Sequence, residues 1–209
     1  MRQTGQLTSD VAFTDTVKAI QTRKGSRQVY ARMEASGSWQ NTISSELKAF
    51  IEAQTSVFLA TANSEGQPYI QHRGGPAGFM RVLDDRTIGF VDFAGNRQYI
   101  TQGNLEQNSK AHLFLIDYAN RRRVKVWGEA RVVEGDTARM ADLMPADYKA
   151  RPEQVILFTV TAWDANCPQH IPRRFEAATV AAELATRDQR IAVLEAQIRQ
   201  LQSAVGGIA

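Results

Sequence analysis

Seven short segments of the chain have the hydrophobic patterns of β-strands, and the connections between most of them are short. Parallel strands need a crossover of a dozen or more residues, usually helical, whereas antiparallel strands can be joined by tight turns. We therefore predict a mainly β fold, an antiparallel β-barrel with peripheral helices rather than a doubly wound sheet. The expected strands are 56–62, 69–73, 79–84, 87–93, 110–118, 123–134 and 155–165.

The sequence divides into three parts. Residues 1–43 are polar and rich in glycine and serine, with weak helical spacing, and we expect an N-terminal arm that orders by packing on the body or on a partner subunit. Residues 44–174 form the barrel domain, which opens with a helix over 44–54. Ser44 is a plausible N-cap for this helix, because its hydroxyl can accept from a free backbone N–H. Residues 175–209 are predicted to form a long C-terminal helix.

This C-terminal helix has a seven-residue repeat. Leu184, Ile191, Ile198 and Val205 are spaced by seven, and Leu194 and Leu201 occupy the intervening core positions. The repeat fits an amphipathic helix packed on its own barrel. It also fits a short coiled coil between subunits, which we favour, and we expect a homodimer.

Composition excludes several classes of protein. The net charge of +3 is small for 209 residues, and the arginines are scattered rather than gathered into a stripe, which argues against nucleic-acid binding. A single cysteine, Cys167, allows no intrachain disulfide and suits a reducing compartment. No segment reaches the ~20 apolar residues of a membrane span. We expect a soluble, cytoplasmic protein without membrane contact.

The connection after the strand 87–93 is the first candidate binding site. Gly95 permits backbone conformations that side chains block. Asn96 is a good helix N-cap, which would place Arg97 and Gln98 in the first helical turn, where free N–H groups and the helix dipole favour an anion. An arginine there can bind a phosphate in a bidentate manner. The alternative is a capped helix whose arginine faces water.

Two further segments carry binding chemistry. His72 and Arg73 precede Gly74 and Gly75, and adjacent glycines allow another molecule to approach the backbone closely. The segment 163–174 contains residue types that recognise planar or charged ligands: Trp163, Asn166, His170, Arg173 and Arg174. Cys167 and His170 suggest a metal, but a structural zinc site takes four N or S ligands, so we predict no metal site and a buried cysteine.

No catalytic motif is present. The sequence contains neither G-x-S-x-G nor the phosphate-binding loop G-x-x-x-x-G-K-[ST]. If the protein is an enzyme, an organic cofactor carries the chemistry, and we cannot assign a catalytic acid or base.

The order of these segments resembles the pyridoxamine 5′-phosphate oxidase-like flavoproteins, which are FMN-binding split β-barrels. The resemblance runs over about residues 45–165, through "FLATANSEGQPYIQHR", "GFMRVLDDRTIGFVDF", "GNRQYITQGNLEQN", "AHLFLID" and "RRRVKVWGEARVV". The tail "NCPQHIPRR" is similar to a branch of flavin-nucleotide-binding proteins of unassigned substrate.

The resemblance implies FMN as cofactor and a set of binding residues. The family's phosphate-binding Ser-Arg-Lys segment matches Asn96-Arg97-Gln98, in which the lysine is replaced. His72 and Arg73 stand near the family's second basic strand. The strand at Arg122-Arg123-Val124-Lys125 resembles one that approaches the flavin of the neighbouring subunit, so Arg123 is included. Asn104 is a further candidate for the ribityl hydroxyls, and Val91, Asp92, Phe93 and Trp163 are candidates for covering the ring.

These implications lead to three hypotheses. The first is a homodimeric FMN-dependent oxidoreductase of unknown substrate and electron donor. The second is a non-catalytic flavin carrier or sensor with the same pocket. The third is a split barrel that binds haem or a deazaflavin, with His72, His112 or His170 as haem ligands.

Overall fold

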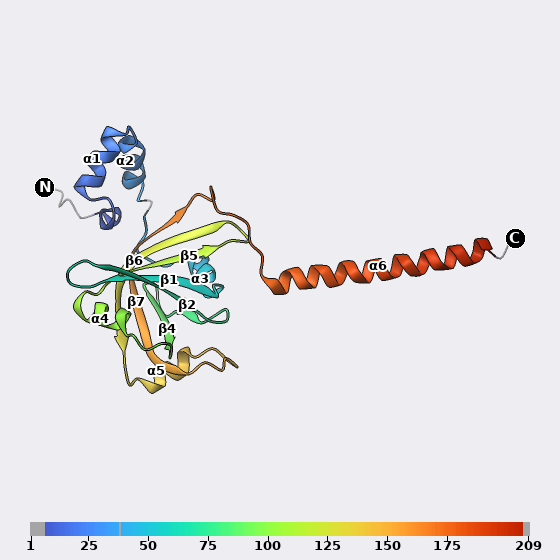
Figure 1. Ribbon diagram of the computed structural model, residues 1–209. Helices are drawn as coiled ribbons and strands as arrows, with labels where there is room; N and C mark the ends of the chain where they lie inside the picture. Colours follow the sequence, from blue (N-terminus) through green and yellow to red (C-terminus); the bar gives the residue numbers. More distant parts are fainter. Residues whose placement is uncertain (1–6, 38, 207–209) are drawn as a thin grey trace. The chain divides into compact units, whose positions relative to one another are not determined.

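The computed structural model describes residues 7–37 and 39–206, with the side chains of 166 and 204–206 excepted (Figure 1). The chain divides into two compact units. The larger unit consists of Met1–Asp117 and Arg122–Pro168, and the smaller of Tyr118–Arg121 and Gln169–Ala209. The predicted arm and C-terminal segment therefore include positions, 1–6, 38 and 207–209, that lie outside the described residues.

Within the described residues, one seven-stranded antiparallel sheet forms the body of the larger unit, which confirms the predicted fold class. The strand order is β2-β1-β5-β6-β7-β4-β3, so β2 and β3 are the two edges. Figure 1 shows the sheet curling on itself as a split barrel. The strands are β1 Ser56–Ala62, β2 Pro68–Gly74, β3 Met80–Val82, β4 Thr87–Phe93, β5 Lys110–Asp117, β6 Arg122–Val133 and β7 Pro152–Asn166.

The alternation predicted for the sixth strand is present. Val124 and Val126 are buried in β6, while Arg123 and Lys125 on the other face are partly exposed. The β6–β7 ladder shifts register between Trp127 and Gly128. A Cβ at Gly128 would lie 2.2 Å from the Thr159 carbonyl oxygen, so only glycine fits at this irregularity.

Helix α3, Ser45–Glu52, begins as predicted and supplies part of the barrel core. The Ser44 hydroxyl accepts from the Leu47 N–H at 3.2 Å, which is an N-cap hydrogen bond. Leu47, Phe50 and Ile51 are buried and join the main apolar cluster with residues of β1, β5, β6 and β7. Burial of this apolar surface is the main source of the barrel's stability.

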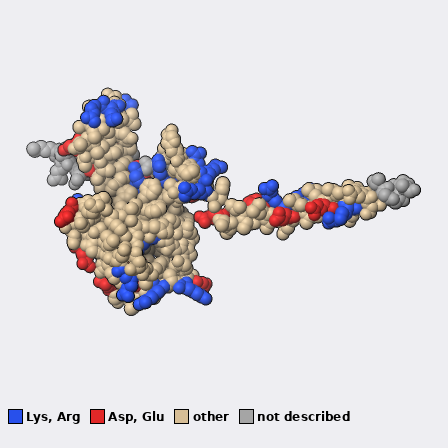
Figure 2. Space-filling view, viewed as in Figure 1, with Lys and Arg blue, Asp and Glu red and all other residues tan. Residues whose placement is uncertain are grey.

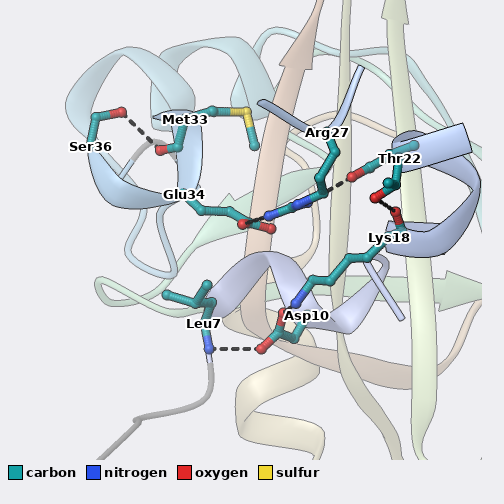
Figure 3. A network of polar contacts seen from close by, with 9 residues as sticks. Leu7, Asp10, Lys18, Thr22, Arg27, Met33, Glu34 and Ser36 are labelled. Atoms are coloured by element: carbon teal, nitrogen blue, oxygen red, sulfur yellow. Dashed lines mark hydrogen bonds and ion pairs between the residues drawn. The ribbon is translucent and has the colours of Figure 1, made fainter. Parts of the chain in front are cut away.

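The N-terminal segment folds into η1 Thr8–Val11, α1 Asp15–Arg23 and α2 Arg27–Ala35. Polar contacts link these helices: Lys18 Nζ of α1 lies 2.6 Å from Asp10 Oδ1 of η1, and Arg27 Nη1 of α2 donates to Gln21 Oε1 of α1 at 2.7 Å. Arg27 also pairs with Glu34 within α2 (Figure 3). Trp39 connects the segment to the barrel. Its ring stacks on Trp127 of β6, with the ring centroids 4.9 Å apart. The Thr8 hydroxyl of η1 donates to the Trp39 carbonyl at 2.6 Å, so η1 and Trp39 attach the segment to the barrel wall.

Three more helices complete the described chain: α4 Ile100–Gln107, α5 Thr137–Leu143 and α6 Ala177–Gly206. Helix α4 follows β4 directly, and α5 lies in the connection between β6 and β7. Among the described residues, no helix is both long enough and apolar enough to cross a membrane.

Candidate functional site

A pocket lies where the barrel is split, between the edge strand β2 and the paired strands β4 and β7. Strand β2 contributes Tyr69, Gln71 and Arg73, which share one face because side chains alternate along a strand. Asp92 of β4 is in register with Gln154 of β7. The segment 95–100, which connects β4 to α4, forms an exposed rim. The sheet's opening thus brings four parts of the chain to one site.

A buried ion pair joins the two sides of the split. Arg73 Nη1 donates to Asp92 Oδ1, and Gln154 Nε2 donates to Asp92 Oδ2 at 3.1 Å. Burial raises the pKa of the Asp92 carboxyl above its usual range, and Arg73 and Gln154 only partly oppose this effect. β2 and β4 are not neighbours in the ladder, so this pair is a side-chain link across the gap.

The Arg73 Nε–H is buried and has no hydrogen-bond partner among the described residues. A buried donor without a partner costs about 1–3 kcal/mol, so native structures pair nearly all such groups. This N–H belongs to a side chain that lines the pocket. A water molecule or an acceptor atom of a bound ligand can serve as the partner of this N–H.

In the rim segment 95–100, the start of helix α4 differs from the prediction. Asn96 is not the N-cap of α4, because Arg97 and Tyr99 both have left-handed backbone, with φ of 58° and 55°, and the helix begins only at Ile100. Asn96 Oδ1 instead accepts from the Gln98 N–H at 3.4 Å within the connection. Gly95 does not occupy the left-handed region. The prediction that Asn96 caps this helix and that Arg97 and Gln98 lie in its first turn is therefore wrong.

Arg97 is nevertheless at the pocket, and it has partners. Its Nε donates to the Tyr99 hydroxyl at 2.9 Å, and that hydroxyl donates to Glu153 Oε1 at 2.7 Å. The guanidinium also lies 3.7 Å from Glu153 Oε1, and 64% of the Arg97 side chain is exposed. Because the interaction is largely solvated, it contributes at most about 1 kcal/mol and can be exchanged for another anion.

The predicted residues after β2 have other roles. His72 points to the face opposite Arg73, where its Nε2 is 2.8 Å from the Ser56 hydroxyl and its ring packs on Phe58. A Cβ at Gly75 would lie 2.7 Å from Phe79 Cβ, and one at Gly74 would lie 3.0 Å from His72 Cε1. Internal packing thus leaves little room for a side chain at either position, and the role of the two glycines in ligand approach stays a prediction.

Several other predicted residues lie away from the pocket. Val91 is buried in a second apolar cluster with residues of α5 and β7. Asn104 is buried in α4, and its Nδ2 donates to Thr61 Oγ1 at 3.0 Å, so it holds α4 on β1. Phe93 does line the pocket, with its ring against Tyr148.

Arg123 and Trp163 are at the other end of the β6–β7 ladder. Arg123 is in register with Asn166, whereas the pocket residues Glu153 and Gln154 lie at the start of β7. The Trp163 indole N–H donates to the Thr42 carbonyl at 2.8 Å, and its ring packs on the main core. In a single chain, neither residue can contact a ligand in the pocket.

Sequence reasoning missed several residues that line the pocket, among them Tyr69, Tyr99, Glu153 and Gln154. Gln71 and Thr101 also line it, and the Thr101 hydroxyl donates to Gln71 Oε1 at 3.1 Å. The alternation along β2 could have found Tyr69 and Gln71, because they share the face of Arg73. Glu153 and Gln154 become visible only once the register of β7 on β4 is known.

The last prediction in this region concerns Cys167. It is exposed rather than buried, because it follows the end of β7 and leaves the apolar ladder. Over residues 7–37 and 39–206, the structure shows no group of three or more His, Cys, Asp or Glu side chains that could hold a metal ion.

Comparison with known families gives one decisive match. The sequence profile described as "Pyridoxamine 5'-phosphate oxidase" matches residues 43–167, more than half of the chain. The chain belongs to the pyridoxamine 5'-phosphate oxidase family. The matched range closes one residue before the larger unit ends at Pro168. A comparison with curated proteins yields no match.

Several solved structures are similar to this family member over part of its length. HupZ of Group A Streptococcus is 21% identical, with 64% of this chain and 99% of that chain covered and a TM-score of 0.49. An FMN-binding protein of Syntrophomonas wolfei is 11% identical, with 70% and 97% covered and a TM-score of 0.45. HutZ, the haem storage protein of Vibrio cholerae, is 15% identical, with 56% and 89% covered and a TM-score of 0.37.

Proposed function

We propose that this member of the pyridoxamine 5'-phosphate oxidase family is a flavoprotein that binds FMN at the split of the barrel and acts as an oxidoreductase. The observation that carries the proposal is the Arg73 Nε–H, a buried donor in the pocket that lacks a partner among the described residues. A phosphate oxygen is the acceptor that fits it best, because an arginine binds phosphate through strong charge-assisted hydrogen bonds.

The rim supplies the remaining polar groups that such a cofactor needs. Asn96 and Gln98 present amides at the pocket, and Arg97 presents an exposed guanidinium beside them. FMN itself would supply the electron transfer, while the protein binds it and adjusts its electronic properties through hydrogen bonds. The residues present therefore fit the phosphate and ribityl parts of the cofactor.

The existing ion pairs of the pocket predict which contact a bound phosphate would replace. Arg73 and Arg97 are each paired with a carboxylate, Asp92 and Glu153. The Asp92 pair is buried and bridges β2 and β4, so we expect it to remain. The Glu153 pair is exposed at Arg97 and is the one that an incoming phosphate would replace.

A second copy of the chain would complete the site. The rim residues 95–100 are exposed, and the ring-covering candidate Trp163 is engaged elsewhere in its own chain. We propose a homodimer in which residues of the other copy cover the flavin ring. The histidines considered as haem ligands, His72, His112 and His170, do not line the pocket among the described residues, and therefore FMN is preferred over haem.

The test is cofactor binding by matched arginine variants. The purified protein should bind FMN, as measured by quenching of flavin fluorescence. Arg73→Lys, which removes the unpaired Nε donor and keeps the positive charge, and Arg97→Ala should each raise the Kd roughly 10- to 100-fold, the value of a charged hydrogen bond of about 1.5–3 kcal/mol. Arg174→Ala is the control, since this residue lies over the Tyr118 ring and not in the pocket. An unchanged Kd for Arg97→Ala, or a Soret band in place of flavin absorbance, would refute the assignment.

A separate measurement distinguishes an enzyme from a carrier. Bleaching of the flavin band by NADH or NADPH, followed by its recovery with an electron acceptor, would support the oxidoreductase. Retention of FMN without any reduction would support the carrier or sensor.

A further inference from the structure

Helix α6 carries a row of large apolar side chains that the described structure leaves exposed. Leu184, Ile191, Leu194, Ile198 and Leu201 are between 41% and 67% exposed. Large contiguous apolar patches on a soluble protein mark interaction surfaces. Helices in proteins also gain most of their stability from packing an apolar face, so a partner for this row would stabilise α6.

The spacing of the row decides what kind of surface fits it. Positions 184, 191 and 198 are seven residues apart, and 194 and 201 lie three residues after the last two of them. In heptad terms these are a and d positions, which form a narrow seam. A helix that packs on a globular surface needs a wider stripe, including e or g positions. Here those positions hold charged or amide residues: Glu183, Asp188, Arg190, Glu195, Gln197 and Gln202.

We propose that α6 pairs with α6 of a second copy of this chain as a parallel two-stranded coiled coil. Isoleucine at a with leucine at d favours two parallel strands, and this combination occurs without interruption from Ile191 to Leu201. In that arrangement, Arg190 at g of one helix faces Glu195 at e of the other. Opposite charges at these positions set partner choice and orientation.

The polar surface of α6 is compatible with this pairing. Figure 2 shows basic and acidic residues interspersed along the helix. Glu195 also lies 3.9 Å from Arg199 in its own helix, an exposed pair that contributes little. Arg187 occupies one d position and ends the uninterrupted core at its N-terminal side. In the parallel pair, it lies next to Glu183 and Asp188, which would otherwise face each other as like charges.

Disulfide trapping in the full chain tests the pairing and its orientation. In a Cys167→Ser background, Leu194→Cys places one thiol at a d position, where the same residue of a parallel partner lies opposite. Oxidised glutathione should convert most of this variant into a covalent dimer on non-reducing gels, reversed by dithiothreitol. Val193→Cys is the matched control, since Val193 is 49% exposed but lies outside the seam. Equal crosslinking at both positions, or none at 194, would overturn the proposal.

A second measurement does not depend on whether the barrels themselves associate. Hydrogen exchange of the amides in 184–201 should be slow in the wild-type chain and in Val193→Asp. It should be at least tenfold faster in Leu194→Asp, because a charge in the seam separates the helices. The same exchange rate in both variants would contradict the coiled coil. This proposal stands apart from the cofactor: FMN binding could fail while the helices still pair.

Discussion

In the barrel, Leu59, Leu113 and Ile156 have no exposed surface, whereas Leu184, Ile191 and Leu201 of α6 expose about half or more of theirs. Both regions are rich in aliphatic residues, so composition alone does not separate them. The difference is the repeat: alternation buries one face of each strand in its own chain, while a heptad seam is buried only when a second helix arrives. The barrel buries its apolar side chains within one chain. We expect α6 to bury its apolar side chains only against a second helix.

The largest expected effect comes from making the same substitution, leucine to alanine, in both regions. Leu59→Ala should lower the barrel's free energy of unfolding by about 2–5 kcal/mol, because it leaves a cavity in a packed core. Leu201→Ala should change the barrel's free energy of unfolding by less than about 0.5 kcal/mol, because it weakens the pairing of α6 and leaves the barrel core intact. Urea unfolding followed by tryptophan fluorescence, at one fixed protein concentration, measures both. Similar losses in the two variants would mean that α6 belongs to the barrel's cooperative unit.

A partly buried histidine provides the next comparison. Burial, with a smaller contribution from Lys125, lowers the pKa of His112 from 6.5 to about 4, and its ring packs edge-on against Trp127. The unfolded chain therefore binds more protons than the folded one between pH 6.5 and about 4, so stability is lost as the pH falls through this range. The loss is at most about 3 kcal/mol, and less because the side chain keeps some exposure.

His112→Gln should remove this part of the acid sensitivity. The measurement is the free energy of unfolding of both proteins at several pH values between 7 and 4, and the two curves should converge as the pH falls. His170→Gln, at an exposed position, is the control. Curves that stay parallel for His112→Gln would contradict the role of its burial.

The smallest expected effect concerns two serines at helix starts. The Ser44 hydroxyl accepts from the Leu47 N–H, whereas Ser26, at the same position of α2, makes no such hydrogen bond. Ser44→Ala should therefore cost about 1 kcal/mol. Ser26→Ala should cost only a few tenths of that, measured in the same urea experiment. Equal costs would show that the capping hydrogen bond is not what stabilises α3.

The sequence predicted those features whose causes are local. The alternation in 123–134 located β6 and its buried face, and Ser44 located the start of α3, because period and capping depend on neighbouring residues. The order of the segments then led to the split barrel and to Arg73 and Arg97 at one pocket.

Features that depend on tertiary contacts were not predictable in the same way. The left-handed backbone at Arg97 and Tyr99 has no sequence signal, since neither is Gly or Asn. Asn104 looked like a ligand-binding amide, but its partner Thr61 is known only once α4 is docked on β1. Trp163 was assigned to the site by residue type, and the register of β7 places it ten residues from the pocket strand end.

The two left-handed residues of the rim also limit how this protein can vary. Left-handed backbone costs an ordinary L-residue roughly 1–2 kcal/mol, and glycine almost nothing. Substitution at position 99 therefore meets two opposing requirements. Glycine would remove the backbone strain, but it would also remove the hydroxyl that joins Arg97 to Glu153. Valine, isoleucine and threonine suit neither demand. We therefore expect homologues with the same rim to have few residue types at positions 97 and 99, even though both side chains are exposed to water.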